Sequence, residues 1–250
     1  MSYTIIIPAR YASSRLPGKP LALVAGKPMI ERVWLQAQKA GASDLVVATD
    51  HAGVQMACER FGAHVCMTRE DHESGTDRLA EVVDQLELGD DAIVVNVQGD
   101  EPLIPPEVIE QVALNLANNP SAGIATLCER ITDHDTLLDP NAVKVVFDKS
   151  GMALYFSRST IPFNRDTAMT AVDLEREAWY RHLGIYAYRA RTLRAFTTWP
   201  MASLERLEKL EQLRALYQGV RIHVEPACAA VPGGVDTQTD LDKVNRLLTP

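Results

Sequence analysis

The chain opens on the stretch Thr4-Ile-Ile-Ile-Pro-Ala-Arg-Tyr-Ala-Ser-Ser-Arg-Leu-Pro-Gly-Lys-Pro20. The apolar run at its start is too short for a helix and ends at a proline, which predicts a buried strand. The loop that follows carries Arg10, Arg15 and Lys19, and no acidic residue precedes Glu31. Because the whole chain has a formal net charge of -8, this cationic loop indicates a site for a strongly anionic ligand.

Strand and helix patterns alternate through the first half of the chain. Short apolar runs predict further strands at Leu45–Thr49, His64–Met67 and Ala92–Val97. Helical spacing or helix-start signals lie between them, in the segments 29–41, 50–61, 74–86 and 105–118. This alternation predicts an α/β fold with a mostly parallel sheet and helices on both faces.

The second half of the chain has a different rhythm. Residues 125–200, with bounds uncertain by a few residues, carry mostly strand-like runs and are expected to form a β-rich lobe within a single domain spanning 1–250. Leucines from Leu204 to Leu213, followed by Tyr217, predict one continuous helix that Gly219 ends. A strand at Arg221–Glu225 and a last helix after Pro232-Gly-Gly-Val-Asp236 complete the expected order.

Composition and motifs exclude several classes of function. A chain this acidic lacks the broad basic face that nucleic-acid binding needs, and no apolar run is long enough for membrane insertion. The sequence has no signal-peptide pattern, so we expect a cytoplasmic protein. It also has no CxxC, HExxH, GxGxxG or GxxxxGK[ST] motif, which excludes the ordinary zinc, dinucleotide and P-loop sites.

The loop after the first strand is a candidate phosphate site. Arg10 and Arg15 can pair with phosphate oxygens bidentately, and Lys19 adds a compact charge. Small residues such as Ser13 and Gly18 allow backbone N–H groups to approach the ligand. A solvated surface loop is the alternative, and the position directly after a core strand favours phosphate binding.

Two acidic residues are candidate magnesium ligands. Asp100, followed by Glu101, comes directly after the predicted strand 92–97, so it belongs to the same sheet edge as the cationic loop. An ordinary turn would explain it equally well in isolation. Asp236 is best explained, by itself, as an acid at a helix N-terminus, and spacing does not decide whether it meets Asp100.

Later segments offer groups that an acidic sugar would need. Arg158 and the pair Arg181-His182 place cations beside strand-like runs, although a lone histidine there is more often structural. Glu211 and Gln212 are explained by pattern alone as a solvated helix face. Ser74 is explained as a helix cap, although a helix N-terminus can also receive a ligand.

Taken together, the motifs resemble the 3-deoxy-manno-octulosonate cytidylyltransferase family, also called CMP-KDO synthetases. The first matching motif is Pro8-Ala-Arg-Tyr-Ala-Ser-Ser-Arg-Leu-Pro-Gly-Lys-Pro-Leu21, and the others follow in family order over nearly the whole length. They are Met67-Thr-Arg, Ser74-Gly-Thr, Asn96-Val-Gln-Gly-Asp-Glu-Pro102, Pro140-Asn-Ala-Val-Lys144, Leu154-Tyr-Phe-Ser-Arg158, Arg181-His-Leu-Gly-Ile-Tyr186, Leu210-Glu-Gln-Leu-Arg214 and Gly234-Val-Asp-Thr237.

The resemblance implies a Rossmann-like nucleotidyltransferase sheet, a homodimer formed largely through the β-rich lobe, and activation of KDO for lipopolysaccharide biosynthesis with CTP and Mg²⁺. It implies that catalysis depends on Arg10, Arg15, Lys19, Asp100 and Asp236, the last two as metal ligands. Nucleotide binding would involve Pro8, Ala9, Arg10, Ser13, Arg15, Lys19, Ser74, Gly75 and Gln98. The sugar acid would contact Arg158, His182, Tyr186, Glu211 and Gln212.

Two other classes of function stay open on the residues alone. A glycosyltransferase on a similar sheet would ordinarily carry D-x-D after a central strand, whereas this chain has Gln98-Gly-Asp-Glu101. A non-catalytic nucleotide sensor would need the cationic loop but not the candidate sugar residues. Release of pyrophosphate from CTP, with and without KDO, separates these classes.

Overall fold

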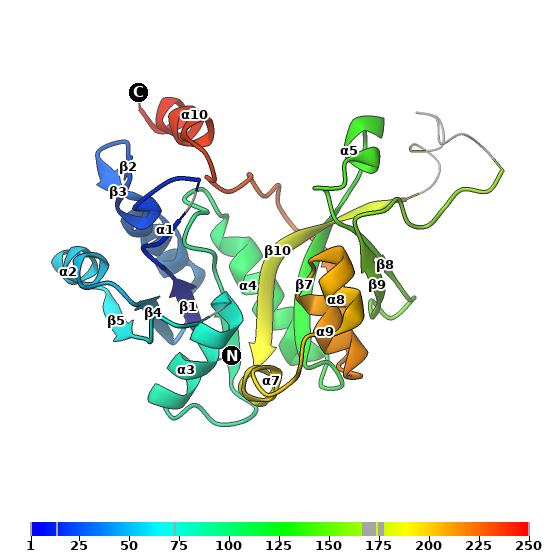
Figure 1. Ribbon diagram of the computed structural model, residues 1–250, viewed down its shortest axis with the longest axis horizontal. Coiled ribbons are helices and arrows are strands. Elements are labelled where there is room, and N and C mark those ends of the chain that lie inside the picture. Colours follow the sequence, from blue (N-terminus) through cyan, green and yellow to red (C-terminus); the bar gives the residue numbers. More distant parts are fainter. Residues whose placement is uncertain (1, 14, 73, 167–173, 175–177, 250) are drawn as a thin grey trace.

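The computed structural model describes residues 2–13, 15–72, 74–166, 174 and 178–249. Within this part of the chain, the main sheet has the strand order β11-β7-β10-β6-β1-β4-β5 (Figure 1). In chain order its strands are β1 (Thr4–Pro8), β4 (Asp44–Thr49), β5 (His64–Met67), β6 (Ile93–Asn96), β7 (Ile124–Arg130), β10 (Tyr180–Arg189) and β11 (Ile222–Pro226).

The first half of the sheet is parallel, as predicted. Strand β1 lies between β4 and β6 and pairs in parallel with both, and β5 continues the sheet beyond β4. Strand β10 is antiparallel to β6 and β7, and β11 pairs in parallel with β7. The predicted α/β class with a mostly parallel sheet is therefore confirmed.

Alternation along β1 divides the hydrophobic core into two layers. Ile5 and Ile7 pack on the side of α1 (Met29–Ala37), α2 (Ala52–Arg60) and α4 (Pro106–Asn118). Ile6 packs on the opposite side, with α3 (Gly75–Gln85), α7 (Ala190–Phe196) and α9 (Gln212–Tyr217). All three isoleucines are fully buried, as expected for a strand covered on both faces.

The segment predicted to be β-rich contains strands, and two of them leave the main path. Strand β8 (Lys144–Phe147) pairs with β10 and with β9 (Ala153–Ser157), which extends the sheet at one side (Figure 1). A short helix, α5 (His134–Leu138), lies between β7 and β8 and was not predicted. Asp133 caps it by accepting a hydrogen bond from the Thr136 backbone N–H at 2.8 Å.

The predicted continuous helix around Leu210 is wrong. The structure has α8 (Ser203–Glu208) and α9, separated at Lys209, whose φ of 53° is left-handed. A left-handed residue ends a helix because it turns the chain out of the helical path. The leucines keep their helical spacing across Lys209, so the sequence pattern does not indicate the break.

Short elements complete the chain. They are the 3-10 turns η1 (Lys19–Leu21) and η2 (Gln38–Ala40), the hairpin of β2 (Leu23–Val24) and β3 (Lys27–Pro28), and α10 (Gln238–Leu248). Across the described residues, no helix has the length and apolar character needed to span a membrane.

Candidate active site

The site is built where β1 and β6 end side by side. Gly99, after β6, passes so close to β1 that an added Cβ would lie 2.7 Å from the carbonyl oxygen of Pro8. On the other side, the Ala9 N–H donates to the Ala48 carbonyl at 2.8 Å, and the Thr49 hydroxyl donates to the Ala9 carbonyl at 2.7 Å. These contacts fix the start of the cationic loop between its two neighbouring strands.

A small separate core brings the C-terminal segment to this edge. Leu16 from the cationic loop and Val235 are buried together with Leu241 and Val244 of α10. The Val235 N–H also donates to the Asp100 carbonyl at 2.8 Å. Asp236 therefore lies beside the cationic loop because its neighbour is anchored there, although 217 positions separate it from Lys19.

Lys19 joins the two acids whose convergence the sequence left open. Its Nζ lies 2.6 Å from Oδ2 of Asp100 and 2.9 Å from Oδ1 of Asp236, and Arg15 Nη2 lies 2.9 Å from the same Asp236 oxygen. Burial lowers the pKa of Lys19, but the hydrogen bonds and charges of the two carboxylates outweigh it, so its pKa is raised. Lys19 therefore stays protonated between them.

Thr237, and not Asp236, caps the N-terminus of α10. Its hydroxyl accepts from the Asp240 N–H at 3.2 Å, and the Asp240 side chain accepts from the Thr237 N–H at 2.9 Å, which completes a capping box. The Asp236 carboxylate is thereby free to face Lys19 and Arg15. The helix-cap explanation applies to its neighbours and not to Asp236 itself.

Two hard carboxylate groups around one cation are a donor set that suits magnesium. The described residues contain no cluster of three or more candidate metal-ligating side chains, so the protein would supply two carboxylates and substrate oxygens the remaining ligands. The position that Lys19 occupies already attracts positive charge. The residues present therefore fit Mg²⁺ bound together with a phosphate ligand.

The cationic loop, the loop after β6 and the start of α3 enclose a cavity of about 320 Å³. All of the residues predicted for nucleotide binding and for the metal line it. Ala12, one of the small residues of the cationic loop, also lines it, and sequence reasoning missed Pro20, His72, Arg78 and Gly99. The lining carries four arginine or lysine side chains against two carboxylates, so the cavity has an excess of positive charge.

Helix α3 points its N-terminus into this cavity. Ser74 caps it in a full capping box with Asp77, as predicted, and Gly75 also lines the cavity. Arg78, on the first turn, is nearly buried and pairs with Asp50 at 2.5 Å. Its spacing of four residues from Ser74 on a predicted helix was the signal that could have identified it.

The residues predicted for the sugar lie mostly on the other side of β6, around β10. His182 contacts the Thr126 hydroxyl at 3.0 Å, and its ring centroid lies 5.3 Å from that of Tyr186. Burial lowers the pKa of His182 to about 3 and raises that of Tyr186. At neutral pH His182 is therefore an uncharged hydrogen-bonding group, and it is not one of the cations expected for a sugar carboxylate.

Glu211 connects this side to the cavity beside Lys19. Its Oε2 accepts a hydrogen bond from the Thr76 hydroxyl at 2.9 Å, and Thr76 lies one residue beyond Gly75 on α3. Burial raises the pKa of Glu211. Glu211 and Gln212 begin α9 after the break at Lys209 and are largely shielded, so the predicted solvated helix face is wrong.

The Arg158 guanidinium is held by backbone carbonyls. Its Nε donates to the carbonyl of Glu208 at 2.6 Å, and Nη1 donates to the carbonyl of Pro140 at 2.9 Å. The Glu208 carboxylate accepts from the Ser157 hydroxyl at 2.7 Å and from the Arg158 N–H at 2.9 Å. Sequence reasoning missed Glu208, which ties β9 to α8.

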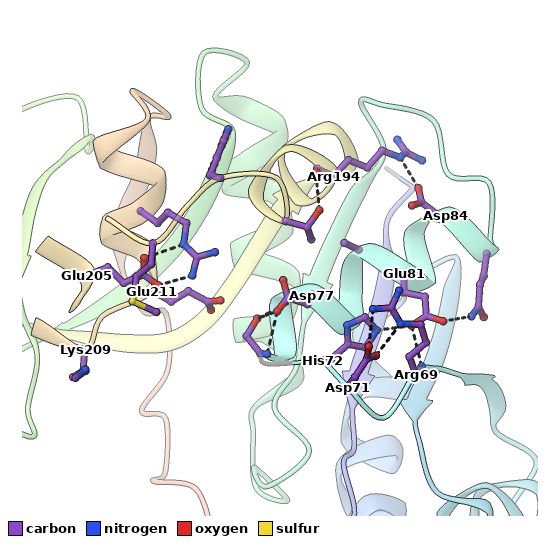
Figure 2. Close-up of a pocket in the computed structure, with 17 residues that line it drawn as sticks. Arg69, Asp71, His72, Asp77, Glu81, Asp84, Arg194, Glu205, Lys209 and Glu211 are labelled. Atoms are coloured by element: carbon purple, nitrogen blue, oxygen red, sulfur yellow. Dashed lines mark hydrogen bonds and ion pairs between the residues drawn. The ribbon is translucent and has the colours of Figure 1, made fainter. Parts of the chain in front are cut away.

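A larger cavity of about 1070 Å³ lies between α3 and the helices α7, α8 and α9 (Figure 2). Its charged groups largely satisfy each other, as in the pairs Arg69–Asp71 and Arg194–Asp84. It carries six carboxylates against four arginine or lysine side chains. Despite its size, it is therefore a poorer site for a triphosphate than the cavity beside Lys19, which it adjoins at His72 and Ser74.

Comparison with known sequences identifies the family of the chain. The family model for cytidylyltransferases matches residues 4–222. The chain is 60% identical over 249 residues to a 3-deoxy-manno-octulosonate cytidylyltransferase of Pseudomonas fluorescens, covering 99% of this chain and 98% of that protein. It is 59% identical over the same shares to the protein of that name from Hahella chejuensis.

Comparison with solved structures agrees. A CMP:2-keto-3-deoxy-manno-octonic acid synthetase complexed with CTP matches with a TM-score of 0.90 and 44% identity, covering 99% of this chain and 98% of the other. A cytidylyltransferase from Leptospira borgpetersenii matches with a TM-score of 0.62 at 15% identity, covering 98% and 85%. The second likeness concerns the fold alone.

Proposed function

This chain belongs to the 3-deoxy-manno-octulosonate cytidylyltransferase family, and we propose that it transfers CMP from CTP to the anomeric hydroxyl of KDO. The observation that carries the proposal is a cluster of four charged residues at the carboxyl edge of a parallel sheet. Lys19 pairs with both Asp100 and Asp236, and Arg15 pairs with Asp236. Such an edge is where open α/β sheets bind ligands.

The reaction is an in-line displacement at the α-phosphorus. The anomeric oxygen forms the new O–P bond, the bond from the α-phosphorus to the oxygen bridging to the β-phosphate breaks, and its electron pair leaves with pyrophosphate. The hydroxyl proton is released to solvent. Since little covalent chemistry falls to the protein, its contribution is positioning and charge neutralisation.

Arg10, Arg15 and Lys19 hold the triphosphate and stabilise the negative charge that develops on the leaving pyrophosphate. In the structure, Lys19 and Arg15 pair with the two carboxylates. Binding of the triphosphate redirects both cations to phosphate oxygens. Ser74, Gly75 and Gln98, which also line the cavity, bind the cytidine end.

We assign Asp100 and Asp236 as the protein ligands of Mg²⁺. When bound, this ion neutralises phosphate charge and acidifies the attacking hydroxyl. Chelation with EDTA should abolish turnover and leave the melting temperature unchanged, because Lys19 already neutralises the carboxylates. Full activity in a chelated, metal-free assay would exclude the assignment.

The sugar acid binds on the β10 side, where Tyr186, Glu211 and Gln212 supply hydrogen bonds and the neutral His182 supplies another. Arg158 donates to the backbone carbonyls of Glu208 and Pro140 through Nε and Nη1. Its remaining N–H groups bind the sugar carboxylate. This assignment predicts that H182A raises KM for KDO and leaves CTP binding unchanged.

A homodimer completes the proposal. Large apolar side chains are exposed on the β-rich side of the molecule, with Leu138 50%, Leu154 63% and Phe163 75% exposed. Burying them against a second copy would remove apolar surface from water. Light scattering should give twice the chain mass, and F163E with L154E should shift it to the monomer.

One assay tests the activity itself. Pyrophosphate release from CTP is measured with and without KDO, and the nucleotide product is identified by mass. KDO-dependent release with formation of CMP-KDO is the expected result. Release without KDO, or CTP binding without release, would replace the proposal with a hydrolase or a nucleotide sensor. Transfer only from a sugar nucleotide to an acceptor would indicate a glycosyltransferase.

A further inference from the structure

The start of the cationic loop is tied to the junction between β4 and α2. The Thr49 hydroxyl donates to the Ala9 carbonyl at 2.7 Å, and the same oxygen accepts from the His51 N–H at 3.3 Å. Thr49 ends β4 and is fully buried, and His51 is the N-cap residue of α2. The end of β1 and the start of α2 therefore share one buried hydroxyl.

The His51 side chain caps α2 with one nitrogen of its ring. Nδ1 accepts a hydrogen bond from the Gly53 N–H at 3.1 Å. A Cβ added at Gly53 would lie 2.9 Å from Cε1 of His51, so a larger residue there would displace the ring. The cap and this close approach fix the orientation of the imidazole.

The Tyr11 ring stacks on the His51 ring. The two ring centroids are 3.9 Å apart, and the ring planes differ by 9°. Tyr11 also lies beside the far end of the loop, because a Cβ added at Gly18 would be 3.3 Å from the Tyr11 hydroxyl oxygen. Gly18 has a φ of 67°, a left-handed conformation that favours glycine, and it directly precedes Lys19. One aromatic side chain therefore lies between the cap of α2 and the residue before Lys19.

Tyr11 acts from outside the proposed phosphate site. Its neighbours Arg10 and Ala12 line the cavity beside Lys19, whereas Tyr11 is not among the described residues that do so. Tyr11 is also 39% exposed, so the stack does not serve to bury a core residue. What the stack does is connect a loop that carries three cations to a fixed point on the fold.

We infer that the stack of Tyr11 on His51 holds the cationic loop in the conformation that binds a triphosphate, so that both are positioning residues. The inference rests on the proposed binding of CTP by this loop. Without the stack, Arg10 and Lys19 would be ordered only when the ligand binds, and the entropy cost of that ordering would reduce affinity.

Two substitutions of His51 separate the stack from the helix cap. H51N keeps a side-chain oxygen that can cap α2 and loses the ring, whereas H51F keeps a ring and loses the cap. H51N should raise the dissociation constant for CTP by about two- to tenfold, which corresponds to the contribution of one aromatic pair, and should melt close to the wild type. H51F should bind CTP like the wild type and melt a few degrees lower.

Matching substitutions of Tyr11 test the other ring. Y11F retains the ring and should keep the wild-type affinity, whereas Y11A should weaken CTP binding as H51N does. Because both residues act through one contact, the double variant Y11A/H51N should bind no more weakly than the single variants. Inorganic triphosphate should show the same loss of affinity, since it can contact the loop and carries no cytidine.

Calorimetric titration of the wild type and these variants decides the outcome. Unchanged CTP affinity in H51N or Y11A would overturn the inference. Affinity that followed the melting temperature across the variants would also overturn it, because the role of His51 would then be structural.

Failure of the proposed function gives a different result. A wild type that binds CTP and releases no pyrophosphate with KDO would refute the proposed transfer and not the role of the stack. A wild type that binds neither CTP nor inorganic triphosphate would refute both.

Discussion

The two sides of the candidate site use charge in opposite ways. Around the cationic loop, charges are partly exposed and in excess, with the Arg15 side chain 65% and the Asp236 side chain 40% exposed. On β10, His182 is buried, and burial lowers its pKa to about 3, so it is uncharged at neutral pH. The first side suits a ligand that brings several negative charges, and the second suits one recognised by the pattern of its hydroxyls.

The difference also concerns how each side is held. The proposed nucleotide side is fixed by backbone contacts between neighbouring strands, as at Pro8 and Gly99. The proposed sugar side is fixed by side chains from distant segments, as where Thr76 donates to Glu211. Substitutions should therefore affect the two substrates separately, and the following predictions test that separation.

The largest effect is expected for D100A. Removing one of the two carboxylates around Lys19 should lower kcat by about three orders of magnitude, as for loss of a major electrostatic group, with little change in melting temperature. The matched control is D84A, since Asp84 is exposed and pairs with Arg194 in the larger cavity. Near-normal turnover of D100A in a pyrophosphate assay with magnesium would remove Asp100 from the site.

A smaller loss is expected for G99A. The new Cβ would meet the Pro8 carbonyl oxygen at 2.7 Å, so the loop after β6 must move away from β1. We expect kcat/KM to fall by more than tenfold and stability by about 1–3 kcal/mol, as for overpacking. G89A is the control, because nothing lies within 4 Å of the added atom there. Equal kinetics of the two variants would show that this close approach is dispensable.

R15A should have a still smaller effect that is confined to the nucleotide. Its exposed guanidinium pairs with Asp236 and is available to phosphate, so its loss should weaken CTP binding by about tenfold. KM for KDO should not change. R69A, which removes another exposed paired arginine, should match the wild type, and calorimetric titration with CTP distinguishes the two variants.

The smallest effect is a change in how stability depends on pH. The pKa of His182 is lower in the folded protein, at about 3, than its ordinary 6.5. Between these pH values, His182 is protonated in the unfolded chain and unprotonated in the folded chain. The protein therefore loses stability as the pH falls below 6.5. H182Q should reduce this loss by a few degrees in melting temperature. An identical acid limb in both proteins would contradict a buried, neutral His182.

Local patterns predicted much of the fold and of the nucleotide side. Apart from the β2–β3 hairpin and the 3-10 turns η1 and η2, the order of strands and helices from residues 4 to 118 follows from apolar runs and caps. The adjacency of β1 and β6 places Asp100 beside the cationic loop. Asp236 could not be placed this way, because its position depends on Val235 packing against Leu16 far away in the sequence.

The sugar side was less predictable for a physical reason. Its arrangement depends on a left-handed residue, Lys209, within an unbroken leucine pattern. It also depends on contacts between distant segments, such as those of Arg158 with Glu208 and Pro140. Helical periodicity reports which residues face a core, and it does not report where a chain turns or which backbone carbonyl an arginine reaches.

The contact at Gly99 has a consequence for redesigning this protein. A side chain at this position would oppose a backbone oxygen, and no rotamer change can move that oxygen. A library aimed at another nucleotide can therefore vary Ser13 and Gln98, whose side chains line the cavity. Position 99 should remain glycine, because a side chain there would displace the loop after β6. Such variants would be lost from the library before any new specificity could be selected.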